Sequence, residues 1–305
     1  MKKKILVFGG TGFLGSSLVK FFLKTQEVVV IYRDKLNFLE CVCNNKNLVL
    51  IKSELCDGLA EKLKEFEIEI VYHLASQQPS GSIEYEKFYD GNVVVTQQIL
   101  KIIKALNLNK VVFVSTSSVY GQISQNNKGY INEKSHIDPV NNYGLTKYIS
   151  EKILEYAFHE TNCKLFIVRF PSLFGKNHLG GLAYDFTKLA KESRDITLFN
   201  NGETYRNLMY VDKAVEFLSL VYSNCSKLNN KEVFLVGSTN SLMIKDIVKH
   251  IITLTNSRSN LIFLNKTLTN NININIDQKY AINKLKFKPE EIFDGLMKYV
   301  EKISR

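Results

Sequence analysis

The feature that most constrains this fold is a glycine-rich segment directly after the first apolar run of the chain. Residues 5–8 are all apolar, as is typical of a strand buried on both faces of a parallel sheet. Gly9, Gly12 and Gly15 follow, and from Phe13 onward the apolar residues recur at helical spacing. Glycines at a strand-to-helix turn let backbone amides approach a phosphate closely, and the first helical turn offers unpaired N–H groups. The expected ligand is therefore a dinucleotide.

Apolar runs and amphipathic segments alternate along the first half of the chain. Helical spacing of apolar residues predicts helices over residues 59–66 and 92–105. Further buried strands are predicted at residues 28–32, 49–51, 70–75, 111–115 and 165–170. Such alternation gives parallel βαβ units that bind ligands beyond the carboxyl ends of their strands. We therefore predict an α/β fold with a doubly wound parallel sheet of the Rossmann type.

Composition excludes several classes of protein. The 305 residues are 45% apolar and 23% charged, which is ordinary for a globular chain. No apolar run reaches the length of a membrane span, so we expect no membrane partner. The five cysteines are scattered and include no second pair at zinc-like spacing. We interpret them as reduced thiols of a cytoplasmic protein without a metal site.

The net charge of +10 raises the question of a nucleic-acid partner. Apart from the N-terminal lysines, basic residues alternate with acidic ones, as in residues 59–69, which indicates solvated helical faces. We therefore expect no nucleic-acid site. The same positive field attracts an anionic nucleotide substrate.

The spacing of Gly9, Gly12 and Gly15 within GGTGFLG resembles that of the extended short-chain dehydrogenase/reductases, a family that modifies nucleotide sugars. Similar segments recur along essentially the whole chain. They include HLAS at residues 73–76, where the family has H-L-A-A, and a segment with Glu54 in place of the family's aspartate. The cofactor-binding residues that this resemblance implies are Gly9, Thr11, Gly12, Phe13, Leu14, Gly15, Arg33, Glu54, Leu55, Leu74, Ala75, Ser76, Asn92, Tyr143 and Lys147.

The residue after the second strand of such folds contacts the adenosine ribose. An acidic residue there binds the 2′-hydroxyl of NAD, whereas Arg33 offers a guanidinium fork suited to a 2′-phosphate. Arg33 therefore predicts NADP as the cofactor. Asp34 leaves NAD possible, and a solvated arginine at a strand end is the plain alternative.

Three residues form the predicted catalytic set. Thr116 follows the strand over residues 111–115. Tyr143 begins the next predicted helix, and Lys147, four residues later, lies on the same face of it. Their order resembles that of the family and implies Tyr143 as the acid/base. The Lys147 ammonium is implied to favour the phenolate and to bind the nicotinamide ribose, and Thr116 to hold the sugar oxygen.

Four residues are predicted to contact the substrate. RFPSLFG at residues 169–175 is similar to the family's R-x-x-N-x-x-G turn, with Ser172 in place of asparagine. Arg206 lies in a segment where the family's arginine meets the substrate's diphosphate or ribose. Ser117 and Ser118 directly follow Thr116, where dehydratases of this family have an acid. His178 is interpreted as a polar loop histidine, with an auxiliary acid as the alternative.

These residues predict NADPH-dependent reduction of the 4-keto group of a 4-keto-6-deoxyhexose. The sugar would be linked to dTDP, GDP or UDP and used in cell-surface polysaccharide synthesis. A 4-epimerase with NAD is the alternative. Serine hydroxyls cannot act as carboxylic acids, so 4,6-dehydration is disfavoured. A non-catalytic NADP-sensing protein on the same fold is a distant alternative.

We expect two lobes. The dinucleotide-binding domain is predicted over residues 1–171, with the chain returning to it at about 205–240. A smaller substrate-binding lobe is predicted over residues 172–305, mainly 172–204 and 241–305. The family resemblance also implies a homodimer that pairs through two helices of the dinucleotide domain.

Overall fold

The computed structural model describes residues 3–79, 84–121, 130–266 and 273–304. Its contacts divide the chain into two compact units. The first unit contains Met1–Val119, Asn141–Arg169 and Val215–Phe234, and the second contains Tyr120–Val140, Phe170–Ala214 and Leu235–Arg305.

The first unit is built on a seven-stranded parallel sheet. Its strands are β1 (Lys4–Phe8), β2 (Glu27–Tyr32), β3 (Leu48–Lys52), β4 (Ile68–His73), β5 (Lys110–Thr116), β7 (Lys164–Phe170) and β12 (Lys231–Leu235). They lie in the order β12-β7-β5-β4-β1-β2-β3. The chain adds strands on one side of β1 and then on the other, as doubly wound folds do. The predicted fold class is confirmed.

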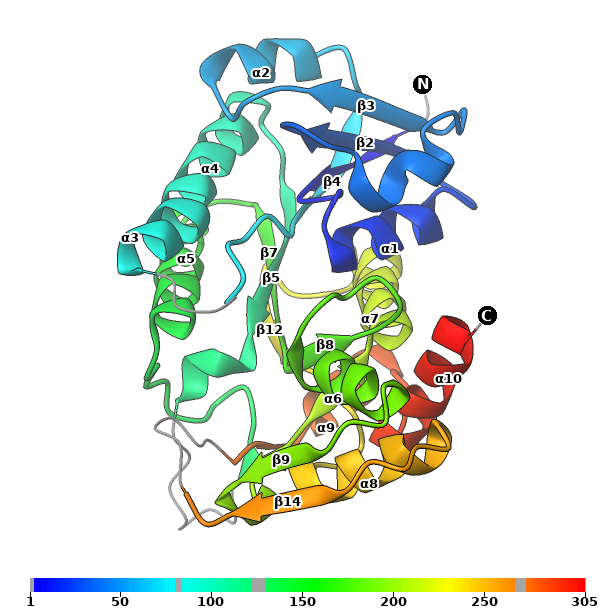
Figure 1. Cartoon of the computed structure of the whole chain (residues 1–305). Coiled ribbons are helices and arrows are strands. Elements are labelled where there is room, and N and C mark those ends of the chain that lie inside the picture. Colours follow the sequence, from blue (N-terminus) through cyan, green and yellow to red (C-terminus); the bar gives the residue numbers. More distant parts are fainter. Residues whose placement is uncertain (1–2, 80–83, 122–129, 267–272, 305) are drawn as a thin grey trace. The chain divides into compact units, whose positions relative to one another are not determined.

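Helices cover both faces of this sheet, with α4 and α5 on one face and α1 and α7 on the other (Figure 1). The helices of this region are α1 (Phe13–Phe22), α2 (Asp57–Leu63), α3 (Tyr85–Phe88), α4 (Val95–Ala105), α5 (Asn142–Phe158) and α7 (Val211–Asn224). The helix predicted from residue 92 starts differently, because a π-helix over Tyr89–Val94 precedes α4. Leu154 of α5 and Ile99 of α4 are fully buried against Val71, Val111 and Phe113 of the sheet.

The described residues of the second unit form short strand pairs and several α-helices. Its strands are β6 (Tyr130–Ile131), β8 (Ser172–Phe174), β9 (Ile196–Phe199), β10 (Tyr205–Arg206), β11 (Leu208–Tyr210), β13 (Leu242–Met243), β14 (Leu261–Leu264) and β15 (Asn275–Ile276). Its helices are α6 (Gly181–Lys191), α8 (Ile244–Leu254), α9 (Lys279–Leu285) and α10 (Ile292–Ser304). In the described parts of the chain, no helix has the length and apolar character needed to cross a membrane.

The units differ from the predicted lobes in several segments, and strand pairing explains two of these differences. Residues 130–140 group with the second unit, because β6 pairs with β15 and Glu133 accepts a hydrogen bond from the Leu235 amide. Residues 205–210 also group there, because β10 pairs with β13 and β11 with β8. Which ligand each unit binds stays a prediction.

The glycine-rich turn brings the ends of β1 and β4 together. Gly9 has a φ of +81°, and a Cβ on it would lie 2.5 Å from the Ala75 amide nitrogen. A Cβ on Gly15 would lie 2.1 Å from the Gly9 carbonyl oxygen. Both distances are far shorter than van der Waals contact, so these positions require glycine.

We predict that Gly15→Ala destabilises the protein by roughly 2 kcal/mol or more, because the new methyl group meets rigid backbone. Gly58→Ala is the matched control, since Gly58 lies on α2 with nothing within 4 Å of an added Cβ. Alanine there should be neutral or stabilise by up to about 1 kcal/mol. Urea denaturation of both variants measures the difference; equal stability of the two would contradict the tight turn.

Candidate active site

The turn between β1 and α1 fits a diphosphate group. Gly12 caps the helix without a side-chain hydrogen bond, and its amide donates to the Gly9 carbonyl at 3.1 Å. The next three residues, Phe13, Leu14 and Gly15, form the first turn of α1. Thr11 lies half-buried in the same turn. The lack of side chains on the glycines and the helix N-terminus suit a bound dinucleotide.

The residues expected at the adenosine end follow the neighbouring strands. Arg33 and Asp34 lie directly after β2 and are both exposed. Glu54 lies beyond β3 and is also exposed, whereas Leu55 packs against the hydrophobic core. Because parallel strands end at the same edge of a sheet, Arg33, Asp34 and Glu54 lie at the edge that contains the glycine turn.

Asn92 joins the loop after β4 to α5. The Leu74 amide donates to the Phe8 carbonyl at 2.9 Å, which starts this loop beside the glycine turn. The side-chain oxygen of Asn92 accepts hydrogen bonds from the Ser76 hydroxyl and from a loop amide, both at 2.8 Å. Its amide nitrogen donates to the Thr146 hydroxyl at 2.9 Å. These bonds are internal, so Asn92 braces the site, and its contact with a cofactor stays a prediction.

The predicted acid/base lies in the first turn of α5. Asn141 caps this helix by accepting a hydrogen bond from the Gly144 amide at 2.8 Å. Burial raises the pKa of the Tyr143 phenol, and hydrogen bonds with Gln78, Ser76 and Thr116 offset part of that rise. The structure therefore brings Tyr143 and Thr116 together, as predicted. Gln78 was not predicted, because it lies in a loop outside any recognisable motif.

Thr116 is the last residue of β5 and interacts with the serines that follow it. Its hydroxyl donates to the Ser118 hydroxyl at 3.1 Å and accepts from the Ser118 amide at 3.1 Å. Ser117 is buried, with 4% of its surface exposed. Ser118 is thus close enough to Thr116 to share a substrate oxygen, whereas Ser117 is enclosed by protein.

Lys147 is buried one helical turn after Tyr143. Only 2% of its surface is exposed, and its ammonium lies 4.1 Å from the centroid of the Phe113 ring. Burial lowers the pKa of Lys147 to about 7, although the charge of Glu151 acts in the opposite direction. The charge of the amine at neutral pH is therefore sensitive to the groups around it.

A buried ion pair lies one further turn along α5. Arg169 donates to both carboxylate oxygens of Glu151, at 3.0 and 2.6 Å, and the Ser115 hydroxyl donates to the same carboxylate. We did not predict this group. Its signal was an arginine inside the apolar run 165–170, since a buried charge needs a partner.

The predicted substrate residues Ser172 and Arg206 both belong to the second unit. Parallel pairing of β8 with β11 sets exposed Ser172 opposite Leu208, two residues after Arg206. The half-buried Arg206 guanidinium donates to the Tyr205 carbonyl at 3.1 Å. Burial lowers the pKa of His178, although Asp185 acts in the opposite direction. At neutral pH His178 is therefore mainly uncharged, so little imidazolium is present to donate a proton.

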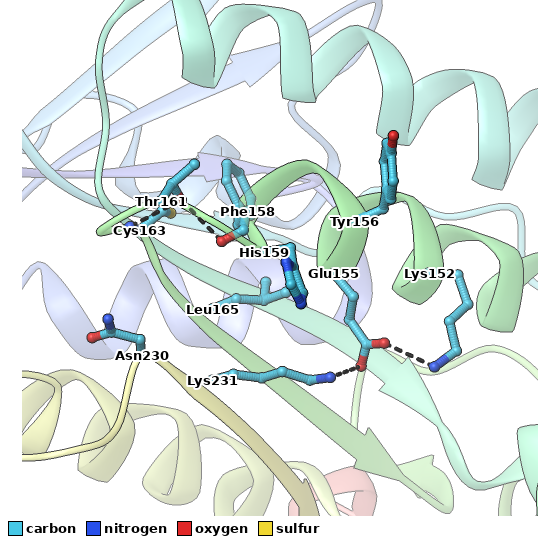
Figure 2. Close-up of a pocket in the computed structure, with 10 residues that line it drawn as sticks. All are labelled: Lys152, Glu155, Tyr156, Phe158, His159, Thr161, Cys163, Leu165, Asn230 and Lys231. Carbon is cyan, nitrogen blue, oxygen red and sulfur yellow. Dashed lines mark hydrogen bonds and ion pairs between the residues drawn. The ribbon is translucent and has the colours of Figure 1, made fainter.

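A cavity of about 490 Å³ lies at the far end of α5 and does not include the predicted catalytic residues (Figure 2). Glu155 in its wall forms ion pairs with Lys152 at 2.8 Å and Lys231 at 2.9 Å. Burial raises the pKa of the Cys163 thiol there to about 12, so the thiol stays protonated and unreactive. We therefore assign the chemistry to the other end of α5.

Comparison with known proteins identifies the family of this chain. The family model of the NAD dependent epimerase/dehydratase family matches residues 5–237. The chain is 25% identical over 316 residues to the uncharacterized UDP-glucose epimerase YtcB of Bacillus subtilis, covering 99% of this chain and 98% of that protein. It is 28% identical over 273 residues to the dTDP-D-glucose 4,6-dehydratase of Dictyostelium discoideum, covering 82% of this chain but 62% of that protein.

A solved structure shows the same fold. It is a Tyr-to-Phe mutant of the UDP-glucuronic acid 4-epimerase from Bacillus cereus, in complex with UDP-4-deoxy-4-fluoro-glucuronic acid and NAD. The TM-score is 0.88 at 25% identity, with 99% of each chain covered. The glycine turn, the sheet order and these matches agree, and the chain belongs to the NAD dependent epimerase/dehydratase family.

Proposed function

We propose that this chain is an NAD-dependent 4-epimerase of a UDP-linked hexose. The observation that supports this most directly is that the Tyr143 phenol lies close enough to Thr116 for that residue to affect its pKa, with serines rather than carboxylates directly after Thr116. This arrangement provides one proton-transferring group at one sugar oxygen. Epimerisation at C4 needs that group to work in both directions.

The side chains divide the work at that oxygen. The hydroxyls of Thr116 and Tyr143 are within hydrogen-bond reach of one another, so both can contact a single substrate hydroxyl. Tyr143 takes the proton when the sugar carbon is oxidised and returns it when the carbon is reduced. Burial raises the pKa of the Tyr143 phenol above its ordinary value of ~10, so forming the phenolate needs a nearby positive charge, and we assign that part to the Lys147 ammonium one helical turn away. Bound NAD supplies a reversible two-electron acceptor.

Dehydration is the less suitable reaction for this site, although one relative is a dTDP-D-glucose 4,6-dehydratase. Removing water across two carbons needs an acid placed next to the threonine. Ser117 and Ser118 occupy those positions, and their hydroxyls do not protonate a leaving hydroxide at neutral pH.

The 4-ketoreductase that the sequence led us to expect has less support than the epimerase. That expectation depended on Arg33 binding the 2′-phosphate of NADP. Arg33 is an exposed side chain, however, and it lies beside the carboxylate of Asp34, which is also exposed. The Bacillus cereus structure contains NAD and a UDP-sugar, and YtcB is described as a UDP-glucose epimerase. We therefore assign NAD to this chain, with Asp34 as the group that accepts the ribose 2′-hydroxyl.

Three further expectations stay predictions: the homodimer, the cytoplasmic location and the part in cell-surface polysaccharide synthesis. The residues that would contact the UDP moiety, Ser172 and Arg206, belong with them.

The cofactor assignment predicts that the protein binds NADH at least about tenfold more tightly than NADPH, because the Asp34 carboxylate repels a 2′-phosphate. Asp34→Ala should weaken NADH binding by roughly tenfold through loss of a charged hydrogen bond. Arg33→Ala, at the neighbouring exposed position, is the control and should leave NADH affinity unchanged. Fluorescence titration measures the affinities of the unmodified protein and of both variants. Tighter binding of NADPH than of NADH by the unmodified protein would favour the 4-ketoreductase hypothesis.

The reaction assay incubates the protein and NAD separately with UDP-glucose, UDP-glucuronic acid and UDP-N-acetylglucosamine. We expect one of them to convert to its C4 epimer, seen by proton NMR, without net change in absorbance at 340 nm. Tyr143→Phe should lower kcat by about 10²–10⁴-fold because it removes the acid/base. Tyr156→Phe is the control, since Tyr156 lies on the same helix and is 89% exposed.

Three results would count against the proposal. Net consumption of NADPH with a 4-keto sugar identifies a reductase, and formation of a 4-keto-6-deoxy sugar identifies a dehydratase. Normal turnover by Tyr143→Phe removes the assigned acid/base.

A further inference from the structure

Glu151 connects three elements of the site through its carboxylate. It lies on α5 one turn beyond Lys147, and its ion pair with Arg169 ties that turn to β7. The hydroxyl of Ser115, the residue before Thr116 on β5, donates to the same carboxylate. Glu151 and Arg169 are 0% and 3% exposed, so this connection is shielded from water.

Among the described groups around the Lys147 amine, Glu151 is the neighbour with a negative charge. On α5, Tyr143 precedes Lys147 by one turn and Glu151 follows it by one turn. From β5 the ring of Phe113 lies against the amine, and from β4 comes His73. Burial and the nearby Lys147 both hold the pKa of His73 well below its usual value, so His73 is neutral.

We propose that Glu151 is a positioning residue of this site, which holds Lys147 and Thr116 in register and keeps the Lys147 amine protonated. The inference rests on the proposed function for its catalytic meaning. Residues four apart on a helix have Cβ atoms about 5–6 Å apart, which is close enough for the carboxylate to favour the charged amine. The hydrogen bond from Ser115 to the same carboxylate also restrains the end of β5, where Thr116 is the next residue.

The test measures the titration of Lys147 by NMR in the cofactor-free full chain labelled with ¹³Cε-lysine. The Phe113 ring displaces the Lys147 signal from those of exposed lysines, and Lys147→Arg assigns it by its disappearance. The unmodified protein should titrate at about pH 7. Glu151→Gln should lower this midpoint by about one pH unit or more, because the amine loses an opposite charge and faces an unpaired Arg169.

Glu155→Gln is the matched control. It removes a carboxylate from the same helix, one turn further on, whose partners Lys152 and Lys231 lie away from the site (Figure 2). The Lys147 titration should not change in this variant. In the epimerase assay, the alkaline limb of the kcat profile of Glu151→Gln should move to lower pH by the same amount as the titration.

The outcomes separate this inference from the proposed function. An unmoved Lys147 titration in folded Glu151→Gln overturns the inference, whatever the enzyme catalyses. If the Tyr143→Phe assay contradicts the proposed function, the Lys147 titration can still be measured, because it needs no enzymatic activity. If Glu151→Gln does not fold, the double variant E151Q/R169M removes both buried charges and should fold while still lowering the midpoint. Failure of both to fold would make the pair a folding requirement and would also overturn the inference.

Discussion

The burial of Lys147 is the constraint on which this site depends. A cation that is removed from water loses much of its hydration free energy, and the protein has to replace it. The Phe113 ring and the Glu151 carboxylate do so here, and Glu151 is in turn neutralised by Arg169. The result is an amine whose pKa of about 7 lies near neutrality rather than far above it. Because Lys147 and its counter-charge Glu151 lie on one helix, the packing of α5 affects both the position and the charge of the amine.

Sheet topology explains why these residues meet. The strand order reverses between β1 and β4, which are neighbours although two other strands lie between them in the chain. Their carboxyl ends therefore lie side by side at the switch point, where such folds leave room for a dinucleotide. Gly9, which follows β1, lies close to Ala75, which follows β4, because these two strands are neighbours in the sheet. β5 is the next strand along, so Thr116 emerges at the same edge.

The sequence predicted the parts of the site that depend on spacing. Glycines at fixed intervals after an apolar run define the turn, and Tyr143 and Lys147 four residues apart define a helical face. It did not predict Gln78 or the bracing role of Asn92, because their contacts join segments far apart in the chain. It left the choice between NADP and NAD open for a different reason. Arg33 and Asp34 are adjacent at a strand end, and residue type alone does not decide which of two exposed charges meets a ribose.

The combination of one tyrosine with serines where dehydratases have acids has a chemical consequence. A reaction that expels a group needs one residue to remove a proton and another to supply one, as two carboxylates do in many enzymes. At the carboxyl end of β5 the groups beside Tyr143 are the hydroxyls of Thr116 and Ser118, which align an oxygen without exchanging its proton at neutral pH. In the reaction that we propose, the same proton therefore leaves one oxygen and returns to it. That condition suits the reversible oxidation of a secondary alcohol.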